Sequence, residues 1–402
     1  MKPGWQIGTI FGIPLLIDSS WFIILVIFTA ANASRFEATG LATGAAWVTG
    51  FILALLLFSS VLLHELGHSL AARSQGIKVN SITLFLFGGV ASIDRESKTP
   101  GQAFQVAIAG PAVSLGLFLL LGTIDLLFSL SNPIVIIVRD LTQINGVLAI
   151  FNMIPGLPLD GGQVLKAAIW KITGSRLKGL RWAATSGKVL GWAAIIMGIL
   201  LYLQIGFGGL WIALLGWFVV RNATSYSRIA DLQEAVGSLD AAGAMTRDFR
   251  VVEASMTLQR FTDDYLLREE GRNPAFFAAS DGRYRGQVLP EDVNQVERSQ
   301  WSSQTLQNIA HALTEIPAVS ETAPLTEAID KLESLELSRI TVISPAGAVA
   351  GVIDRGDVVR ALAERLKVPV PDAMIERIKD EGKFPSGLPL QAIARALIDE
   401  AT

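Results

Sequence analysis

The chain has 402 residues, of which 51% are hydrophobic and 17% are charged, and its formal net charge is −3. This charge gives no indication of a nucleic-acid partner, and the absence of cysteine excludes disulfides and thiolate metal sites. Only eight of the 36 acidic residues precede Asp231. We therefore expect an apolar N-terminal part and a soluble C-terminal part.

The first 18 residues, MKPGWQIGTIFGIPLLID, alternate loosely between apolar and polar positions and are interrupted by Gly and Pro. They lack the compact basic and apolar plan of a cleaved signal peptide. The pattern predicts a short pair of strands at a membrane surface.

Six windows that follow are apolar and long enough to cross a bilayer as helices. We expect them near residues 19–33, 45–71, 104–128, 134–154, 186–205 and 208–222. The fourth is the weakest, because Arg139 and Asp140 interrupt it; snorkelling of Arg139 or its pairing with Asp140 would make the charge tolerable. The windows predict a multi-pass α-helical membrane protein.

Loop charges orient these crossings, since Lys and Arg in short loops favour the cytoplasmic side. With the N-terminus inside, the outer loops hold only Arg35. The inner side then holds Arg73, Lys78, Arg95, Lys98, Lys166, Lys171, Arg176, Lys178, Arg181, Lys188, Arg221 and Arg228. We expect both termini to be cytoplasmic and the protein to lie in a bacterial cell membrane, with an internal photosynthetic or organellar membrane as the alternative.

The second crossing contains LLHELGH, residues 62–68, with two of the three histidines of the chain. In a helix, His64 and His68 project from one face at the spacing of two imidazoles on one Zn²⁺. Glu65 can then act as general base toward the attacking water, and a dication would compensate its buried charge. The alternative is polar packing between helices, but the pattern favours a zinc site.

The next segment, VNSITLFLFGGVASI at residues 79–93, is rich in β-branched and aromatic residues and contains a Gly-Gly break. It predicts a re-entrant pair of strands that dips toward the zinc site. An exposed edge there could bind an extended peptide by strand addition. The alternative is an amphipathic connector on the inner surface.

Catalytic zinc usually takes three protein ligands and leaves one position for water, so a third ligand is needed. The remaining histidine, His311, lies in the polar half, and a carboxylate is therefore expected. The candidates are Asp125, Asp140 and Asp160. His64 should lie about 14 Å from the inner end of its helix, and Asp160 is the candidate on the matching side.

Asp160 lies in NMIPGLPLDGGQ, residues 152–163, whose prolines and glycines argue against a regular helix. Irregular backbone at membrane depth is tolerated where protein buries it or where it lines a watery cavity. The segment therefore favours Asp160 as the third ligand. An ordinary exit loop with a solvated Asp is the alternative.

These motifs resemble those of the site-2 protease family, the intramembrane zinc metalloproteases. The resemblance covers roughly residues 5 to 225 and rests on H-E-x-x-H, on FGG at 87–89, on AGP at 109–111 and on FNMIPGLPLDGG at 151–162. The last motif is the most specific, because it is similar to N-x-x-P-x-x-P-x-D-G almost position for position. The resemblance implies hydrolysis of peptide bonds within transmembrane segments, with one Zn²⁺ per chain.

The resemblance also assigns residues. His64, His68 and Asp160 match the zinc ligands of the family, and Glu65 matches its catalytic glutamate. Asn152 matches an Asn that the family places near the metal, where it would hold the substrate carbonyl or the developing oxyanion.

Substrate contacts are expected at two further places. Asn145 resembles a recurring family Asn, although a hydrogen bond between helices explains it equally well. Phe87, Gly88 and Gly89 belong to the predicted strand pair, which would receive a locally unwound substrate helix. The expected partners are the lipid bilayer and transmembrane protein substrates.

From about Asp231 the chain is polar and repeats itself. AMTRDFRVVEASMTLQRF, from Ala244, resembles ALTEIPAVSETAPLTEAI, from Ala312, and the copies lie roughly 65 to 68 residues apart. This predicts a duplicated β-α-β-β-α unit. It resembles a tandem cystathionine-β-synthase (CBS) domain pair.

The resemblance to CBS pairs implies an adenine-nucleotide site in which Asp292 and Asp357 match the ribose-binding Asp. The hydroxyl position near the phosphate departs from the pattern, being Leu289 in one copy and Asp354 in the other, and an acid there would repel phosphate. The alternative is a pair that serves only in docking or homodimerisation. His311 is expected to be a surface or packing residue.

The expected organisation is a membrane-embedded zinc metalloprotease domain at 1–230, a tandem CBS regulatory domain at 237–366 and a C-terminal helical tail at 367–402. The function favoured by the motifs is regulated intramembrane proteolysis, with the CBS pair as modulator. One alternative is a CBS-regulated transporter, which predicts polar residues along several crossings and inverted repeats, and the sequence displays neither. The other is a catalytically inactive, metal-binding membrane regulator.

Overall fold

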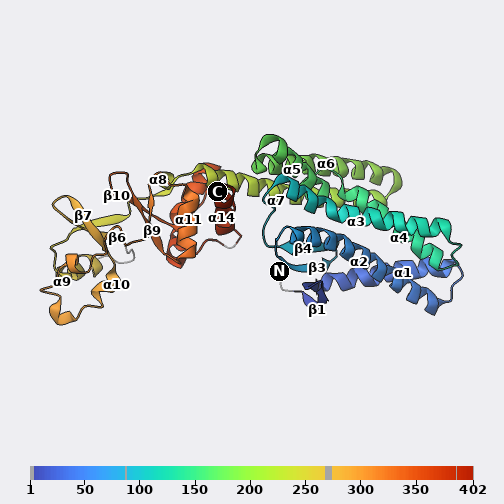
Figure 1. Cartoon of the computed structure of the whole chain (residues 1–402), viewed down its shortest axis with the longest axis horizontal. Coiled ribbons are helices and arrows are strands. Elements are labelled where there is room, and N and C mark those ends of the chain that lie inside the picture. The colour runs from blue at the N-terminus through green and yellow to red at the C-terminus, as the bar shows by residue number, and fades with distance from the viewer. Residues whose placement is uncertain (1–3, 87, 268–273, 386, 402) are drawn as a thin grey trace. The chain divides into compact units, whose positions relative to one another are not determined.

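A computed structural model describes residues 4–86, 88–267, 274–385 and 387–401 of the chain (Figure 1). The chain forms two compact units, Met1–Ala230 and Asp231–Thr402. The first unit consists of long helices with one four-stranded sheet, and the second contains two three-stranded sheets covered by helices.

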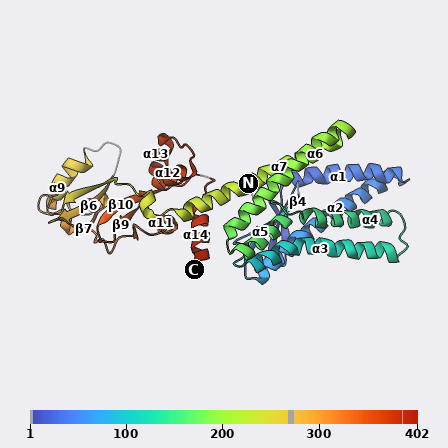
Figure 2. The same ribbon diagram turned by 90° about the horizontal axis from the view of Figure 1, so that it is seen from above.

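The long apolar helices confirm the predicted multi-pass α-helical fold. In the described part of the chain, six helices are long and apolar enough to cross a membrane. They are α1 (Ser19–Ala38), α2 (Thr43–Ser74), α3 (Pro100–Leu127), α4 (Ile134–Asn152), α6 (Arg176–Ile205) and α7 (Phe207–Ser238). Figures 1 and 2 show α1 beside α2 and α3 beside α4, with the α1–α2 and α3–α4 connections at one end of the unit.

Charged residues in the apolar helices form ion pairs at this end. Arg35 of α1 contacts the Asp140 carboxylate with N···O distances of 2.7 and 3.1 Å. Arg139 Nε contacts both oxygens of Asp125, at 3.1 and 3.0 Å. The expected pairing of Arg139 with Asp140 is wrong, because adjacent residues of a helix do not face each other.

The sheet of the first unit has the strand order β1-β2-β3-β4. Its strands are β1 (Trp5–Ile10), β2 (Ile13–Ile17), β3 (Val79–Phe85) and β4 (Gly88–Ile93). The β1–β2 and β3–β4 pairs are antiparallel, as the two predicted strand pairs require, and β2 joins β3 in parallel. Among the described residues, no strand pairs with the outer edge of β4.

An irregular segment, residues 153–159, connects α4 to helix α5 (Asp160–Thr173). A Cβ on Gly161 would lie 2.3 Å from the Met153 carbonyl oxygen, and one on Gly162 would lie 2.3 Å from the Leu157 nitrogen. The sequence argued against a regular helix throughout this segment. A helix nevertheless begins at Asp160, because the two glycines let its first turn pack directly on the preceding backbone.

The two sheets of the second unit have matching topologies, as the sequence duplication predicts. One has the order β5-β6-β7 and the other β10-β9-β8, and each combines one parallel with one antiparallel pairing. The strands are β5 (Phe249–Glu253), β6 (Ala275–Ser280), β7 (Arg283–Val288), β8 (Ala318–Ser320), β9 (Arg339–Ile343) and β10 (Val349–Asp354).

In the described residues of the second unit, seven α-helices follow α7. They are α8 (Ala241–Ala244), α9 (Leu258–Phe261), α10 (Pro290–Val293), α11 (Leu325–Ser334), α12 (Arg355–Leu366), α13 (Asp372–Glu381) and α14 (Leu390–Ala401). Leu390 and Ile393 of α14 belong to the same apolar core as Ile329 of α11. Ile375 of α13 packs against Val359 of α12, so the last two helices share the core of this unit.

Candidate metal centre

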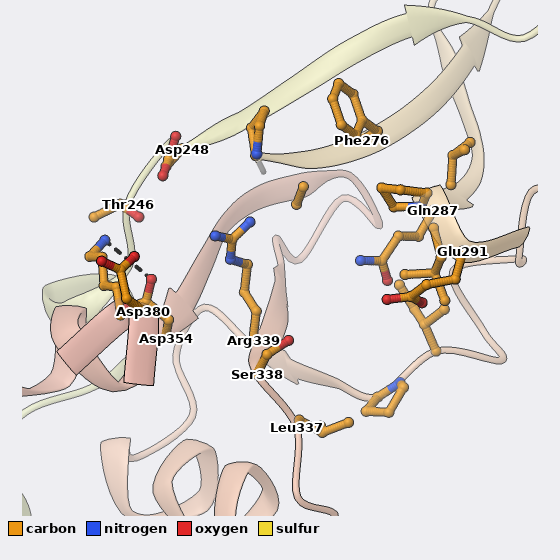
Figure 3. Close-up of a pocket in the computed structure, with 18 of the residues that line it drawn as sticks. Thr246, Asp248, Phe276, Gln287, Glu291, Leu337, Ser338, Arg339, Asp354 and Asp380 are labelled. Atoms are coloured by element: carbon orange, nitrogen blue, oxygen red, sulfur yellow. Dashed lines mark ion pairs between the residues drawn. The ribbon is translucent and has the colours of Figure 1, made fainter. Parts of the chain in front are cut away.

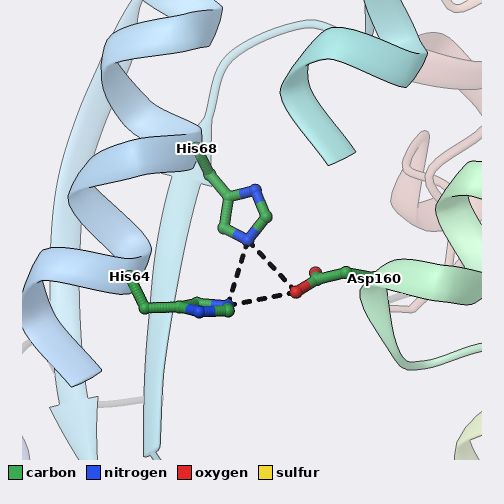
Figure 4. A group of neighbouring side chains, drawn as sticks. All are labelled: His64, His68 and Asp160. Atoms are coloured by element: carbon green, nitrogen blue, oxygen red, sulfur yellow. Dashed lines mark hydrogen bonds and ion pairs between the residues drawn. The ribbon is translucent and has the colours of Figure 1, made fainter. Parts of the chain in front are cut away.

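Three side chains that could hold a metal meet between α2 and the first residue of α5 (Figure 4). Asp160 Oδ2 lies 3.0 Å from His64 Nε2 and 3.3 Å from His68 Nε2. The two Nε2 atoms are themselves 3.3 Å apart. The α2 helix and the glycine-rich turn before α5 thus bring together the three residues that the sequence nominated as ligands.

The spacing of these atoms fits one zinc ion. Ligand bonds of about 2.0–2.1 Å in a tetrahedron place neighbouring donor atoms about 3.3 Å apart. Two imidazoles and one carboxylate are also a donor set that Zn²⁺ accepts, and three protein ligands leave a fourth position for water. The arrangement has the composition of a catalytic rather than a structural zinc site.

Both imidazoles are oriented by contacts on their other nitrogen. His68 Nδ1 lies 2.7 Å from the Val106 carbonyl oxygen, which can only accept a hydrogen bond, so Nδ1 of this ring carries the hydrogen. His64 Nδ1 lies 2.9 Å from the hydroxyl of Ser114. The Val106 carbonyl thus leaves the Nε2 lone pair of His68 available for a metal, and the Ser114 hydroxyl can accept from Nδ1–H of His64 in the same tautomer.

Helix α3 approaches the two rings closely at Gly110. A Cβ on this residue would lie 2.2 Å from His68 Nε2 and 2.7 Å from His64 Nε2. Real Cβ atoms essentially never make such contacts, so a larger residue here would have to displace the Nε2 atoms that form the donor triangle. This contact explains the AGP motif, to which the sequence alone assigned no role.

Strand β4 contacts Glu65. A Cβ on Gly89 would lie 2.6 Å from Glu65 Cγ and 3.4 Å from its Oε1, so the strand backbone lies directly against this side chain. Gly88 has a φ of 133°, which side-chain-bearing residues rarely adopt. Phe87, the third residue of the FGG motif, lies outside the described residues.

A cavity of about 870 Å³ surrounds these groups. Its lining includes His64, Glu65 and His68 on one side and Asn152 with Asp160 on the other. Gly88, Gly89, Val90 and Ala91 of β4 form a further part of the wall. Asn152 is the last residue of α4, so the start of the irregular segment places its amide in the same cavity as the three candidate ligands.

Asn145 lies elsewhere. Its side chain is fully buried, and its Nδ2 donates to Ser60 Oγ of α2 at 3.1 Å and to the Leu141 carbonyl at 2.8 Å. Within the described part of the chain, Asn145 does not line the cavity. These contacts correspond to the hydrogen bond between helices that the sequence left open as its alternative role.

The second unit contains a separate cavity of about 1430 Å³, whose lining includes Thr246, Arg339, Asp354 and Lys379 (Figure 3). Lys379 of α13 lies 3.2 Å from an oxygen of Asp354 and 2.9 Å from an oxygen of Asp357. Burial and the charge of Asp354 raise the pKa of Asp357, although Lys379 opposes this shift. Asp357 therefore already has a cationic partner.

Asp292, the corresponding residue of the first copy, also has an internal partner. Its carboxylate lies 2.7 Å from Nε2 of His311. The side chain of His311 is about half-exposed and lines the same cavity. Asp354, at the hydroxyl position of the second copy, caps helix α12 by accepting a hydrogen bond from the Asp357 N–H, which gives this acid a structural role.

The fold and the three side chains together define a multi-pass membrane protein that carries, beside its membrane-crossing helix α2, a set of donor atoms suited to a catalytic zinc. Residues 52–133 and 128–194 match the model of peptidase family M50, and residues 309–364 match that of the CBS domain. A Synechocystis sp. protein named as a zinc metalloprotease is 40% identical to this chain over 366 residues, which are 90% of this chain and 96% of that protein.

Methanocaldococcus jannaschii supplies a sequence match and a structural match. A protein of this organism named as a zinc metalloprotease is 28% identical over 88% of this chain and 94% of its own length. The solved structure of a site-2 protease from this organism is 30% identical over 56% of this chain and 94% of that chain, with a TM-score of 0.42. From the 40% identity above, this chain belongs to peptidase family M50, the site-2 proteases, and is a zinc-dependent metalloprotease with a CBS domain.

Proposed function

We propose that this metalloprotease cleaves peptide bonds within transmembrane segments of membrane-anchored proteins, with its metal site in the domain formed by residues 1–230. His64, His68 and Asp160 would hold the zinc, and Glu65 would act as the general base. The observation that carries the proposal is the 3.0–3.3 Å triangle of donor atoms, two of which belong to α2, a helix that is apolar enough to cross a bilayer, and the third to Asp160 at the start of α5.

Each residue has a distinct task in this reaction. His64, His68 and Asp160 would hold a zinc ion that would supply Lewis acidity toward the scissile carbonyl and would acidify the attacking water. Glu65 takes a proton from the attacking water and passes it to the leaving nitrogen, which is the usual work of a positioned carboxylate. Asn152 lines the same cavity, and its amide N–H donates to the substrate oxygen as negative charge develops on it.

The free edge of β4 is the proposed binding site for substrate. A transmembrane helix hides its peptide groups in its own hydrogen bonds and must unwind before cleavage. An unwound segment could replace those bonds by pairing with β4, whose outer edge has no partner strand among the described residues. Because β4 contacts Glu65 through Gly89, a segment added there would pass beside the general base.

The membrane orientation follows from loop charges. We infer that both termini face the cytoplasm of a bacterial cell, because the positive residues concentrate at the end of the helices that carries the β-sheet and α5. The outer end carries the Arg35–Asp140 and Arg139–Asp125 pairs, in which the positive charges are compensated.

We also propose that the CBS pair, residues 237–366, modulates the protease, with 367–402 as an additional helical segment. A nucleotide bound through Asp357 or Asp292 would have to displace Lys379 or His311, which already contact these carboxylates. This favours regulation by docking or by a homodimer over tight nucleotide binding. Titration of the full chain with AMP and ATP tests it, and a micromolar Kd for the unaltered protein would contradict it.

The proteolytic mechanism is tested by two substitutions and a control. Glu65→Gln should retain zinc and lose cleavage of a co-expressed transmembrane substrate, whereas His64→Ala should lose both. Glu37→Gln, which alters a glutamate at the end of α1 away from the cavity, should behave as the unaltered protein. Persistent cleavage by Glu65→Gln would exclude the proposed base, and membrane proteins that co-purify with this variant are candidate substrates.

A further inference from the structure

Three charged side chains meet in the first unit outside the metal centre. Glu96 Oε2 lies 2.6 Å from Lys166 Nζ and 2.7 Å from a guanidinium nitrogen of Arg176. The side chain of Lys166 is only 7% exposed, whereas that of Glu96 is 56% exposed. A buried ammonium requires a partner, so Lys166 depends on an acid that itself reaches solvent.

The two sides of this ion pair belong to different walls of the catalytic cavity. Glu96 follows β4 in the connection to α3, and Lys166 lies in α5, the helix that begins with Asp160. Both residues line the cavity. The contact between them therefore joins the wall formed by β4 to the wall formed by α5.

A substrate strand would need the space that this contact closes. A peptide paired with the outer edge of β4 would lie about 4.8 Å from it, and both β4 and α5 contribute residues to the wall of the cavity. An N···O distance of 2.6 Å leaves no passage for a polypeptide backbone between Glu96 and Lys166. A transmembrane substrate continues as a chain on both sides of the scissile bond. It would therefore extend past the Glu96–Lys166 contact.

We propose that Glu96 and Lys166 form a latch across the substrate groove, which a substrate chain must open before it is cleaved. This inference rests on the proposed function, because it concerns how substrate reaches the site. Backbone carbonyls of the incoming chain replace Glu96 as acceptors for the Lys166 ammonium. Lys166 thereby becomes a positioning residue for the substrate.

Opening requires little movement of the backbone. The connection that carries Glu96 is fixed on both sides, by the Asp94 N–H donating to the Lys78 carbonyl at 2.9 Å and by the Ser97 hydroxyl donating to Gln75 at 3.1 Å. The glutamate side chain is half-exposed and can rotate toward solvent while these contacts persist. Opening the latch therefore requires rotation of the Glu96 side chain and leaves the loop backbone in place.

The absence of cysteine in the chain allows a direct test. Cysteines at positions 96 and 166 of the full-length protein are joined by a short bis-methanethiosulfonate reagent, which a reductant removes. Cross-linking should reduce cleavage of a transmembrane substrate at least tenfold with zinc content unchanged, and reductant should restore it. The matched control joins cysteines at Arg35 and Asp140, an ion pair outside the cavity, and should change cleavage less than twofold.

A second variant weakens the latch and leaves Lys166 in place. In Glu96→Gln the amide oxygen can still accept from the Lys166 ammonium, but the charge that strengthens the contact is removed. This variant should cleave the same substrate at low concentration at least as fast as the unaltered protein. Undiminished cleavage by the cross-linked protein, or a tenfold loss in Glu96→Gln with zinc retained, would overturn the latch. Failure of the unaltered protein to cleave any transmembrane substrate would instead contradict the proposed function.

Discussion

Gly110 offers a sharp test of the metal centre. A Gly→Ala substitution can be made at two positions of α3, and we expect it to weaken zinc binding at one position and not at the other. In Gly110→Ala the new Cβ would meet His68 Nε2 at 2.2 Å and His64 Nε2 at 2.7 Å. In Gly116→Ala, also in α3, the new Cβ meets nothing within 4 Å. The helix propensity gained is equal in the two variants, so a difference between them isolates the contact with the imidazoles.

The magnitude follows from the geometry of the rings. Relief of a 2.2 Å contact needs a shift of about 1 Å or more, either of α3 or of the two imidazoles. A ring shift of this size breaks the donor triangle and the contacts on the Nδ1 atoms. Loss of such orienting contacts typically lowers metal affinity 10- to 100-fold, and overpacking a tight interior costs about 1–3 kcal/mol.

The assay is competition for zinc between the purified protein and a chromogenic chelator. Gly110→Ala should bind zinc at least tenfold more weakly than the unaltered protein and should lose most of its cleavage activity. Gly116→Ala should match the unaltered protein in both, with a stability gain of about 0.5–1 kcal/mol. Zinc affinity of Gly110→Ala within twofold of the unaltered protein would refute the assignment of these side chains as ligands.

Three further expectations concern other residues. Asn152→Ala should keep zinc but lower kcat about 10²- to 10³-fold, and a change in KM alone would contradict its role at the oxyanion. Lys379→Met should destabilise the second unit by about 1–3 kcal/mol in hydrogen exchange of the full chain, because the buried Asp357 loses one cationic partner and keeps Arg360 at 3.3 Å; unchanged amide protection would exclude the Lys379 ion pair as a stabiliser. Burial raises the pKa of Glu96, but the charges of Lys166 and Arg176 outweigh burial and hold it below its ordinary value of 4.5. The stability gained from this ion cluster should therefore be complete above pH 4.5 and decline as the pH falls through the lowered pKa, and acid unfolding of Glu96→Gln should lack this component.

The sequence alone could predict those features of the fold and the site that depend on residues close together in the chain. Two histidines four residues apart in an apolar helix must share a face, and apolar length alone predicted six crossings. Asp160 could be nominated because prolines and glycines interrupt the chain beside it. Gly110 could not be linked to the imidazoles in this way, because that contact depends on how closely α3 approaches α2, and a single sequence has no period that encodes this distance.

The same reason explains the ion pairs that sequence reasoning missed. Glu96 and Lys166 are separated by two helices, and Lys379 reaches Asp357 from a helix that the sequence left without a function. A charge in a short loop is ordinarily solvated, so nothing in the local pattern distinguishes Glu96 from Arg95 beside it. Glu96 differs from Arg95 because its partner, Lys166, is buried. Only the fold determines that burial.

The two walls of the catalytic cavity are held by different kinds of contact. Backbones touch directly on the metal side: a Cβ on Gly67 of α2 would lie 2.8 Å from the Ala109 carbonyl, and those on Gly161 and Gly162 would meet the preceding segment at 2.3 Å. Interiors packed this closely resist displacement. On the other side, β4 is held by its hydrogen bonds to β3 and by polar contacts such as that between Glu96 and Lys166. Polar contacts can be exchanged for those of an incoming chain, so a substrate can open the strand side of the cavity while the positions of His64, His68 and Asp160 stay fixed.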